Sequence, residues 1–438
     1  MTPAPDYPAP AVEPVKEKKP EGIWKSKWDT QFYGFVEADT IYDSTQGLND
    51  SAGNSAIARP NTYTGDHGQT TFGARNSRLG FKLGAPEYNG VKASAQLEMD
   101  FLGNQPTTAT EAQFWQNPTM RFRHYNVKLE TPVVDLLFGQ YWDLFGWQTF
   151  AHPATVEIQG LPGQVYGRAP QIRVSKTIKS DAVNLDIAVA AVRPPQRDSA
   201  VPDGQAGVKL TLPHLQAWHT GGGAGTALDP AGIGVSVIGR RFSPNPFPGM
   251  PQASQVSKNG YGLSVDAIVP IVPATKEHHD NALTFTGSFV TGAGIADQYT
   301  GLSGGVGEPT PATPPGGTAP VYTPNIDNGL ALYALNADGT YSLHPIQWTS
   351  FIVGLQYYLP GGHVFLAANY SHMSSANADD FGAHNKVFNE SDWADGNLFW
   401  DVTPAVRLGL EFAWFQQGYA DGVDATNYRT QFSAFYIF

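Results

Sequence analysis

The charged residues of this sequence suggest recognition of small ions rather than catalysis. In segments that alternate between polar and apolar positions, the basic residues on the polar side are Arg78, Lys82, Arg173, Arg407 and Arg429, with Arg121, Arg123 and Arg168 as further candidates. The planar guanidinium group of arginine binds two oxygens of a carboxylate or phosphate at once. If the polar sides of these segments line one space, we expect that space to favour small anions.

Acidic residues occupy the same polar sides. They are Glu37, Asp39, Glu98, Asp100, Asp186, Asp401 and Glu411. Asp143 and Glu157 lie in a segment without alternation, and we expect them to set an electric field across the space, opposite the arginines. Each arginine has a second interpretation of equal weight, in which it forms a structural ion pair with one of these acids.

Other chemistries have weaker support. The chain has no cysteine, which excludes disulfides, thiolate metal sites and cysteine nucleophiles. No Gly-x-Ser-x-Gly nucleophile elbow between a strand and a helix accompanies the histidines, so we predict that the protein is not an enzyme. We interpret His278 and His279 as solvated turn residues and predict neither a metal nor a cofactor. The net charge of −12 argues against nucleic-acid binding, which normally requires a basic face.

The last hairpin of the chain shows which elements must position these charges. From Ala405 to Phe438, apolar and aromatic residues alternate with polar ones, including Arg407, Glu411 and Arg429. Alternation with a period of two indicates strands, because successive side chains point to opposite faces. A strand pair with an aromatic-rich apolar face and a charged opposite face is typical of a transmembrane β-barrel, with lipid outside and water inside.

The rest of the chain supplies strands of the same kind. We expect them near residues 31–42, 71–83, 91–101, 121–129, 135–142, 167–178, 183–191, 205–212, 233–241, 261–269, 283–290, 347–358, 364–371 and 397–402, before the final hairpin. This predicts an all-β, antiparallel up-and-down barrel of about 16 strands. Alternate connections are short and long, as in such barrels. The exception is the Gly-rich stretch near Gly221, which is too long for a turn on the short side.

One predicted strand conflicts with its own alternation. Arg121 and Arg123 share a parity with Tyr125, Val127 and Leu129, which would point both arginines at lipid. Arginine facing lipid is costly except near an interface. Either both residues lie at the rim, or a β-bulge turns them inward, and we favour the bulge.

Three stretches lack a strand pattern. Residues 1–30 are rich in proline and lysine, and we expect a flexible leader before a barrel of residues 31–438. Residues 143–165 follow the fifth strand. Residues 292–345 are rich in glycine and proline, and we expect a large outer loop there.

Several segments resemble the DcaP-like outer-membrane porins. They are "ARNSRLGFKL", "LLFGQYWDLFG", "GRAPQIRVS", "NLFWDVTPAVRLGLEFAW" and the terminal "YRTQFSAFYIF". The resemblance covers about residue 30 to the end, and it implies a trimeric 16-stranded porin that favours small anionic solutes such as dicarboxylates. Porins of this size fold the loop after strand five into the lumen, which implies a constriction at residues 143–165. The leader lacks the heptads of the coiled coil that the family's founding members carry.

These observations predict a porin for passive diffusion of small hydrophilic, anionic solutes. The alternative is a surface barrel that transports nothing and serves in adhesion or envelope anchoring. We expect a homotrimer in the bacterial outer membrane, with both termini in the periplasm and with lipid and lipopolysaccharide around the barrel. Contact between the leader and the cell wall is a further expectation, and no nucleic-acid partner is expected.

Overall fold

The computed structural model describes residues 28–46, 50–51, 57–104, 115–157, 160–195, 200–243, 257–300, 302, 330–380 and 387–438. The expected leader therefore lies outside the described residues except at its end, as do residues 301 and 303–329 of the expected outer loop.

Nearly all of the secondary structure in the described chain is β-strand. The strands of the main sheet are β1 (Asp29–Asp43), β2 (Gln69–Gly73), β3 (Arg78–Gly84), β4 (Lys92–Asp100), β5 (Arg121–Glu130), β6 (Asp135–Trp142), β7 (Arg168–Ile178), β8 (Asn184–Val192), β9 (Asp203–Thr220), β10 (Thr226–Phe242), β11 (Lys258–Val272), β12 (Leu283–Ala293), β15 (Gln347–Tyr358), β16 (Val364–Ser375), β17 (Phe388–Thr403), β18 (Val406–Tyr419) and β19 (Asp424–Ile437). β13 (Ala331–Leu335) and β14 (Tyr341–Pro345) form a separate hairpin. Short 3-10 turns lie at η2 (Ala296–Gln298) and η3 (Ala378–Asp380).

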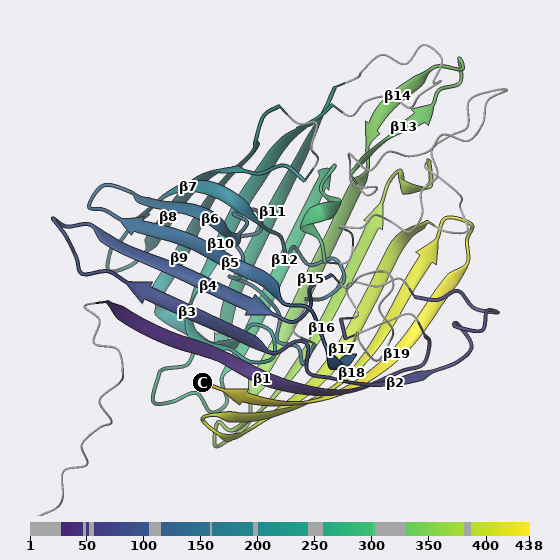
Figure 1. The fold of residues 1–438 in the computed structure, drawn as a ribbon. Helices are drawn as coiled ribbons and strands as arrows, with labels where there is room; N and C mark the ends of the chain where they lie inside the picture. The colour runs from purple at the N-terminus through teal and green to yellow at the C-terminus, as the bar shows by residue number, and fades with distance from the viewer. Residues whose placement is uncertain are drawn as a thin grey trace, which may run out of the picture.

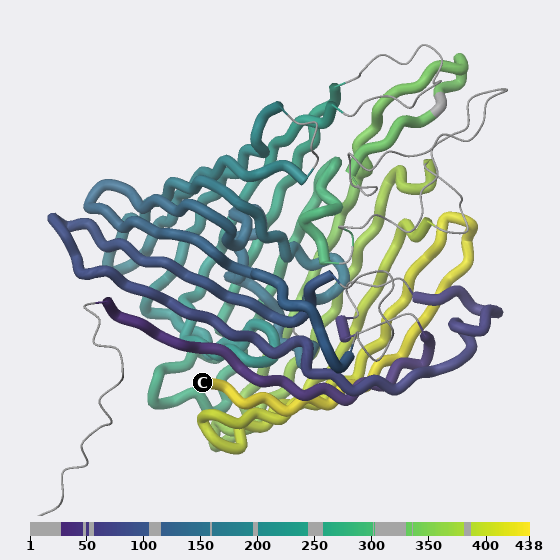
Figure 2. Tube along the Cα trace, in the orientation of Figure 1, coloured from purple at the N-terminus to yellow at the C-terminus, as the bar shows by residue number. Residues whose placement is uncertain are grey.

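The main sheet closes on itself. Neighbouring strands pair antiparallel around the sheet, and the first strand pairs with the last, from Phe35 opposite Ile437 to Asp43 opposite Arg429. Figure 1 shows this seam, where purple β1 runs beside yellow β19. The tube in Figure 2 follows the same closed wall. β2 and β3 both pair with β1 and form one interrupted strand, which makes a closed barrel of 16 strands. The predicted fold class and strand number are confirmed.

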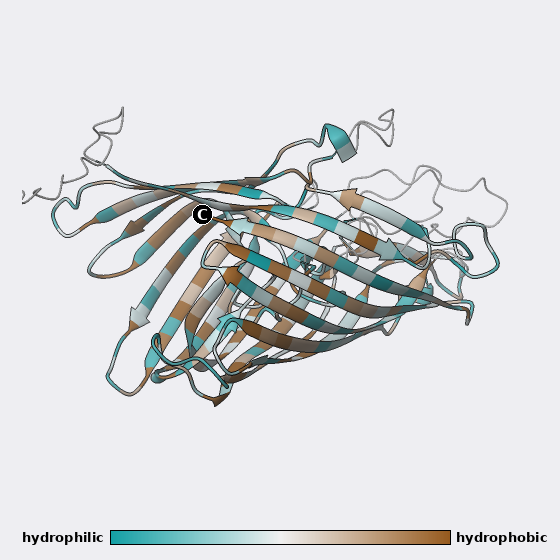
Figure 3. Ribbon diagram, turned by 90° about the horizontal axis from the view of Figure 1, so that it is seen from below, coloured by the Kyte–Doolittle hydropathy of each residue, from teal (hydrophilic) through white to brown (hydrophobic). Residues whose placement is uncertain are grey.

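The two faces of the wall differ as the alternation predicts. Along β19, Arg429, Gln431 and Ser433 are fully buried, whereas Phe432 is 42% and Tyr436 is 56% exposed. The same alternation of apolar and polar positions is visible along the strands in Figure 3. Polar residues thus face the interior and apolar residues form the outer band, as in membrane barrels. The described residues include no helix that is long and apolar enough to span a bilayer.

The conflict in β5 is resolved by a β-bulge. The register against β4 shifts between Glu98, which lies opposite His124, and Met99, which lies opposite Phe122. Arg123 is the extra residue, so Arg123 and His124 are both buried while Phe122 is half exposed. A bulge places two residues of one strand against one of the other. The bulge therefore turns Arg123 inward and keeps it out of the apolar outer band.

Several strands are longer than predicted. β9 continues to Thr220 and β10 begins at Thr226, so the Gly-rich stretch is a turn of only five residues, 221–225. The expected long connection at this place was wrong. β17 likewise begins at Phe388, nine residues before the predicted start at Asn397.

The end of the lumen away from the chain termini contains a hydrophobic core. Residues of the predicted outer loop, which has structure in η2 and the β13–β14 hairpin, pack against inward side chains of the wall and against the 143–165 segment. Members include Phe145, Leu161, Val165, Ile295, Tyr299, Leu332, Leu343, Trp348, Trp393 and Phe415. The expectation of a loop without secondary structure was therefore wrong for the described part of residues 292–345.

Candidate functional site in the barrel lumen

The 143–165 segment is bound to one wall by a series of polar side chains. Asn369 of β16 donates to the carbonyl of Ala154 at 2.8 Å, and the amide of Val156 donates to Asn397 of β17 at 2.9 Å. The amide of Glu157 donates to Glu411 of β18, also at 2.9 Å. Neighbouring strands thus each present one inward polar group to an extended stretch of this segment.

The start of the segment is bound to a different wall. The amides of Leu144 and Phe145 both donate to Gln205 of β9, and the amide of Gly146 donates to Ser236 of β10 at 2.7 Å. In a barrel with this strand order, β9 and β10 lie far around the ring from β16–β18. The segment therefore has hydrogen bonds to two separate parts of the inner wall.

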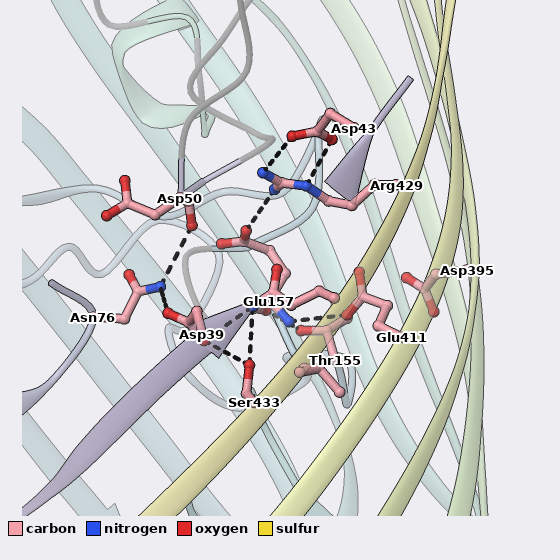
Figure 4. Close-up of polar contacts among 12 residues, drawn as sticks. Asp39, Asp43, Asp50, Asn76, Thr155, Glu157, Asp395, Glu411, Arg429 and Ser433 are labelled. Atoms are coloured by element: carbon pink, nitrogen blue, oxygen red, sulfur yellow. Dashed lines mark hydrogen bonds and ion pairs between the residues drawn. The ribbon is translucent and has the colours of Figure 1, made fainter. Parts of the chain in front are cut away.

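Arg429 anchors the segment through a buried ion-pair network (Figure 4). Its guanidinium donates to both carboxylate oxygens of Asp43, at 3.0 and 3.2 Å, and to Glu157 at 3.1 Å. All three side chains are at most 1% exposed. Glu157 was expected to oppose the arginines across the space, and instead its carboxylate is paired with one of them.

Further carboxylates surround this network. Asp39 accepts hydrogen bonds from Ser433 at 2.6 Å and Asn76 at 3.1 Å, as Figure 4 shows. Glu37 lies two residues earlier on the same inward face and is fully buried. The wall formed by β1 and β17–β19 is therefore rich in acidic groups, which are held largely beneath the surface.

The wall formed by β3–β7 is rich in arginine. Arg123 donates to Glu98 at 2.8 Å and to Asp100 at 3.0 Å, and Arg121 donates to Asp100 at 2.6 Å. Arg78 lies 3.7 Å from Glu98. The paired acids are 0% to 8% exposed, whereas Arg121 is 31% and Arg78 is 20% exposed. The guanidinium groups of Arg121 and Arg78 are thus more exposed than the carboxylates with which they pair.

Two more predicted arginines on this wall contact neutral groups. Arg168 lies 4.7 Å from the ring centre of Trp142, and Arg173 donates to the side chain of Gln171 at 2.9 Å. Among the described residues, no acid lies within ion-pair distance of Arg168 or Arg173. An aromatic face attracts a guanidinium without neutralising its charge. These two residues therefore add positive charge to the β3–β7 wall.

The remaining predicted charges lie apart from these clusters. Arg407 pairs with Asp401 near the start of β18. Lys82 is exposed near the end of β3, with its Nζ 4.8 Å from the ring centre of Tyr33. Asp186 lies 3.5 Å from Lys209, an inward lysine of β9 that was not predicted.

A cavity of about 500 Å³ lies between the arginine-rich wall and the 143–165 segment. Its lining includes Tyr33, Arg78, Glu98, His124, Trp142, His152, Gln164, Tyr166, His219 and the stretch from Gly221 to Ala227. Aromatic rings and a few convergent polar groups are the usual lining of a site that takes a small solute.

Burial and charge set the ionisation of three loop groups, of which His152 and Tyr166 line this cavity. Burial, followed by the charges of His219 and Arg123, lowers the pKa of His152 to about 3, so this residue is neutral at pH 7. Burial alone would raise the pKa of Tyr166, but Arg123, Arg78 and Arg168 together lower it to about 8. Burial, followed by the charge of Asp297, raises the pKa of Asp143 to about 6.

Sequence reasoning missed several inward groups. Asn369 and Asn397 bind the 143–165 segment, and Arg240 forms a buried network with Asp203 and Asp297. Each lies at an inward position of an alternating strand, which is the signal that could have singled it out. The partners could not be inferred, because they lie far away in sequence.

One group among the described residues has the composition of a metal site. His372, Glu390 and Asp392 lie within 4.8 Å of one another on the outer face of β16 and β17. His372 and Asp392 already share a hydrogen bond of 2.9 Å. The group is remote from the lumen.

Comparison with known proteins finds similar structures but no similar sequences. No protein-family model matches the chain, and no curated protein matches it by sequence. The crystal structure of the outer membrane channel DcaP of Acinetobacter baumannii aligns with a TM-score of 0.66 at 18% identity, covering 95% of this chain and 99% of that one. An anion-selective porin from Comamonas acidovorans aligns with a TM-score of 0.55 at 9% identity, covering 94% and 100%.

OmpT of Vibrio cholerae, an outer membrane protein in its trimer form, aligns with a TM-score of 0.50 at 11% identity, covering 94% of this chain and all of the other. At such identities the likeness concerns the fold alone. The chain therefore has the fold of the outer-membrane porins, and the resemblance to DcaP-like porins seen in its sequence is confirmed at the level of the fold.

Proposed function

We propose that this protein is an outer-membrane porin that admits small hydrophilic solutes by passive diffusion, with a preference for anions such as dicarboxylates. The fold supports the first part, because closed 16-stranded barrels with a polar interior commonly enclose a water-filled path. As in porin trimers, three copies would associate in the outer membrane, surrounded by lipid and lipopolysaccharide. Both chain ends would face the periplasm, where the short connections lie.

The observation that supports the anion preference is the exposure of the arginine side chains. On the β3–β7 wall, Arg121 is 31% exposed and its partner Asp100 is fully buried; Arg78 is 20% exposed and Glu98 is 8% exposed. A solute that passes this wall would therefore contact the guanidinium groups more readily than the carboxylates. A planar guanidinium can replace part of the hydration shell of a carboxylate through two parallel hydrogen bonds.

The 143–165 segment would form the constriction opposite these arginines. Its hydrogen bonds to Gln205 at one end and to Asn397 and Glu411 at the other support this role, because they hold it against two parts of the inner wall. The buried acids of the β1 and β17–β19 wall would add a transverse field that pulls anions toward Arg78 and Arg121.

One observation favours the alternative of a surface barrel that conducts nothing. The core formed by Ile295, Tyr299, Leu332, Leu343 and Trp393 fills part of the outer lumen with apolar side chains. In this alternative the outer loops would serve adhesion or envelope anchoring, and purified protein would not increase the permeability of a membrane.

Solute flux into vesicles tests the proposal. Liposomes with and without the purified full-length protein would be compared for swelling in succinate, in a neutral solute of the same size, and in a diamine of the same size. We expect the fastest swelling with succinate, and a loss of that advantage in Arg78→Gln/Arg121→Gln protein. The matched control is Arg59→Gln, which removes a solvent-exposed ion pair with Asp421. Equal rates for all three solutes would refute the anion preference, and no swelling would favour the alternative.

A further inference from the structure

The β9–β10 hairpin ends in a ribbon that leaves the barrel wall. On one side, β8 pairs with β9 only as far as Thr211, opposite Asn184. On the other side, β11 pairs with β10 only from Gly232, opposite Ile268. Residues 213–230 therefore form a two-stranded extension, called here the ribbon, and no strand of the described residues pairs with either of its edges.

The sequence explains where the ribbon begins. Pro213 and Pro230 lie at its base, and the register between β9 and β10 shifts between Pro230 and Ala231. Proline cannot donate to a neighbouring strand and is confined to edges and bulges. A register shift bends a strand pair. The prolines at the base of the ribbon therefore prevent further strand pairing there, and the register shift lets the ribbon bend away from the sheet.

Contacts show that the ribbon turns inward. The amide of Thr220 donates to Gln356 at 3.1 Å, and its hydroxyl lies 3.1 Å from that of Tyr358. Both partners are inward-facing residues of β15 with at most 4% exposure. The side chain of Trp218 stacks on His279 with ring centres 4.3 Å apart. The ribbon therefore lies inside the barrel and contacts the inward-facing residues at the Tyr358 end of β15.

The tip of the ribbon reaches two elements across the lumen. Arg407 of β18 donates to the carbonyl of Gly223 at 3.1 Å and to the hydroxyl of Thr226 at 2.9 Å. The amide of Gly222 donates to the carbonyl of Pro153, in the 143–165 segment, at 3.0 Å. Arg407 is only 4% exposed, and it holds Asp401 with the rest of its guanidinium.

The tip also forms one side of the lumen cavity. Residues 221–227 line it on one side, and Tyr33, Arg78 and Phe438 line it on another. Phe438 is the end of the chain, so this part of the cavity lies at the barrel end that carries the chain termini. Four of the five residues of the turn are glycine, and the tip therefore narrows the path with backbone rather than with side chains.

We propose that the ribbon is a second constriction of the channel, at the termini end of the barrel, and that Arg407 is the residue that positions it. Solute that has passed the arginine-rich wall leaves between the glycine tip and the inner face of β1 and β3. This inference rests on the proposed function, because a constriction has a meaning only in a conducting barrel.

Thiol labelling tests the position of the tip. The chain has no cysteine, so a single introduced cysteine takes all of the label. A Cβ at Gly225 would meet no heavy atom within 4 Å, and the same holds for Gly239, an outward residue of β10. Single-channel currents of Gly225→Cys and Gly239→Cys protein would be recorded in planar bilayers before and after a bulky charged methanethiosulfonate. We expect the label at 225 to reduce the conductance severalfold and the label at 239 to leave it unchanged.

A rescue experiment tests the role of Arg407. Arg407→Gln should free the tip and raise the conductance. A Cβ at Gly221 would lie 3.4 Å from the Cβ of His152, close to the separation of about 3.5–4.5 Å in disulfides. In His152→Cys/Gly221→Cys/Arg407→Gln protein, oxidation should return the conductance to the value of the double-cysteine protein with Arg407 intact, and reduction should raise it again.

The outcomes separate this inference from the proposed function. A silent wild-type protein would contradict the proposed function itself. A conducting wild-type protein whose current is unaffected by the label at residue 225 would refute the ribbon as a constriction. Failure of the disulfide to reverse the effect of Arg407→Gln would refute the positioning role of Arg407.

Discussion

Replacement of Arg429 by glutamine should destabilise the barrel and loosen the 143–165 segment. Arg429 makes three charge-assisted hydrogen bonds, two to Asp43 and one to Glu157, in a site where no member is more than 1% exposed. Glutamine cannot balance two carboxylates. Removal of one partner from a buried ion pair costs about 3–5 kcal/mol, and we expect the lower end because a barrel lumen contains water.

Equilibrium or kinetic unfolding in denaturant, followed by the gel mobility of the folded barrel, measures the stability. Single-channel recording of the same protein measures the conductance, which should rise and fluctuate more as Glu157 loses its anchor. Arg59→Gln is the control, because Arg59 and Asp421 form an ion pair in which both side chains are more than 20% exposed, and such pairs contribute little. Equal stabilities for Arg429→Gln and Arg59→Gln protein, with unchanged conductance, would refute the proposed anchor.

Three further changes probe the lumen. Raising the pH through about 8 should weaken the anion preference, because Tyr166 then becomes a phenolate beside Arg123 and offsets its charge. Reversal potentials at pH 7 and 9 would check this, and Tyr166→Phe should reduce the pH effect. Asn397→Leu removes the acceptor of the Val156 amide hydrogen bond. We expect more noise in the open-channel current, while the protein still runs as a folded barrel on gels. An unchanged noise spectrum would argue that this hydrogen bond does not hold the 143–165 segment. Gly234→Val should displace Trp147, whose ring would lie 2.7 Å from the new Cβ, and a shift in tryptophan emission is the expected signal.

The barrel itself could be predicted from the sequence because its cause is local. In β4, apolar and polar residues alternate without interruption, so a one-residue slip would turn Glu98 and Asp100 toward lipid. The β5 bulge could be predicted for the same reason, since the arginines conflict with the parity of their neighbours. Strand number and closure followed from repeating this argument along the chain.

The ends of strands and the interior of the lumen could not be predicted in the same way. Pro213, Pro230 and the glycines at 221–223 are turn signals locally, yet contacts with Tyr358 and Arg407 hold the intervening residues in a strand pair. The binding of Ala154 and Val156 depends on residues more than 200 positions later in the chain. Such contacts arise from the closed barrel and have no signature in the local pattern of residues.

The same limit applies to the charges. The sequence identified which residues face inward, but it gave equal weight to lumen-lining arginines and to structural ion pairs. Arg429 lies fully within an ion pair, whereas Arg121 is paired and still partly exposed. Which role dominates depends on side-chain burial, and burial depends on the packing of the 143–165 segment.

The most direct test of the proposed function is the reversal potential of the purified protein in a planar bilayer under a KCl gradient. The exposed guanidinium groups of Arg78 and Arg121 predict an anion-selective potential, which should move toward zero in Arg78→Gln/Arg121→Gln protein. Closure in three equal steps would indicate the proposed trimer. A cation-selective potential would contradict the arginine-based account and assign selectivity to the acids around Glu37 and Asp39, and folded protein that carries no current would contradict the channel itself.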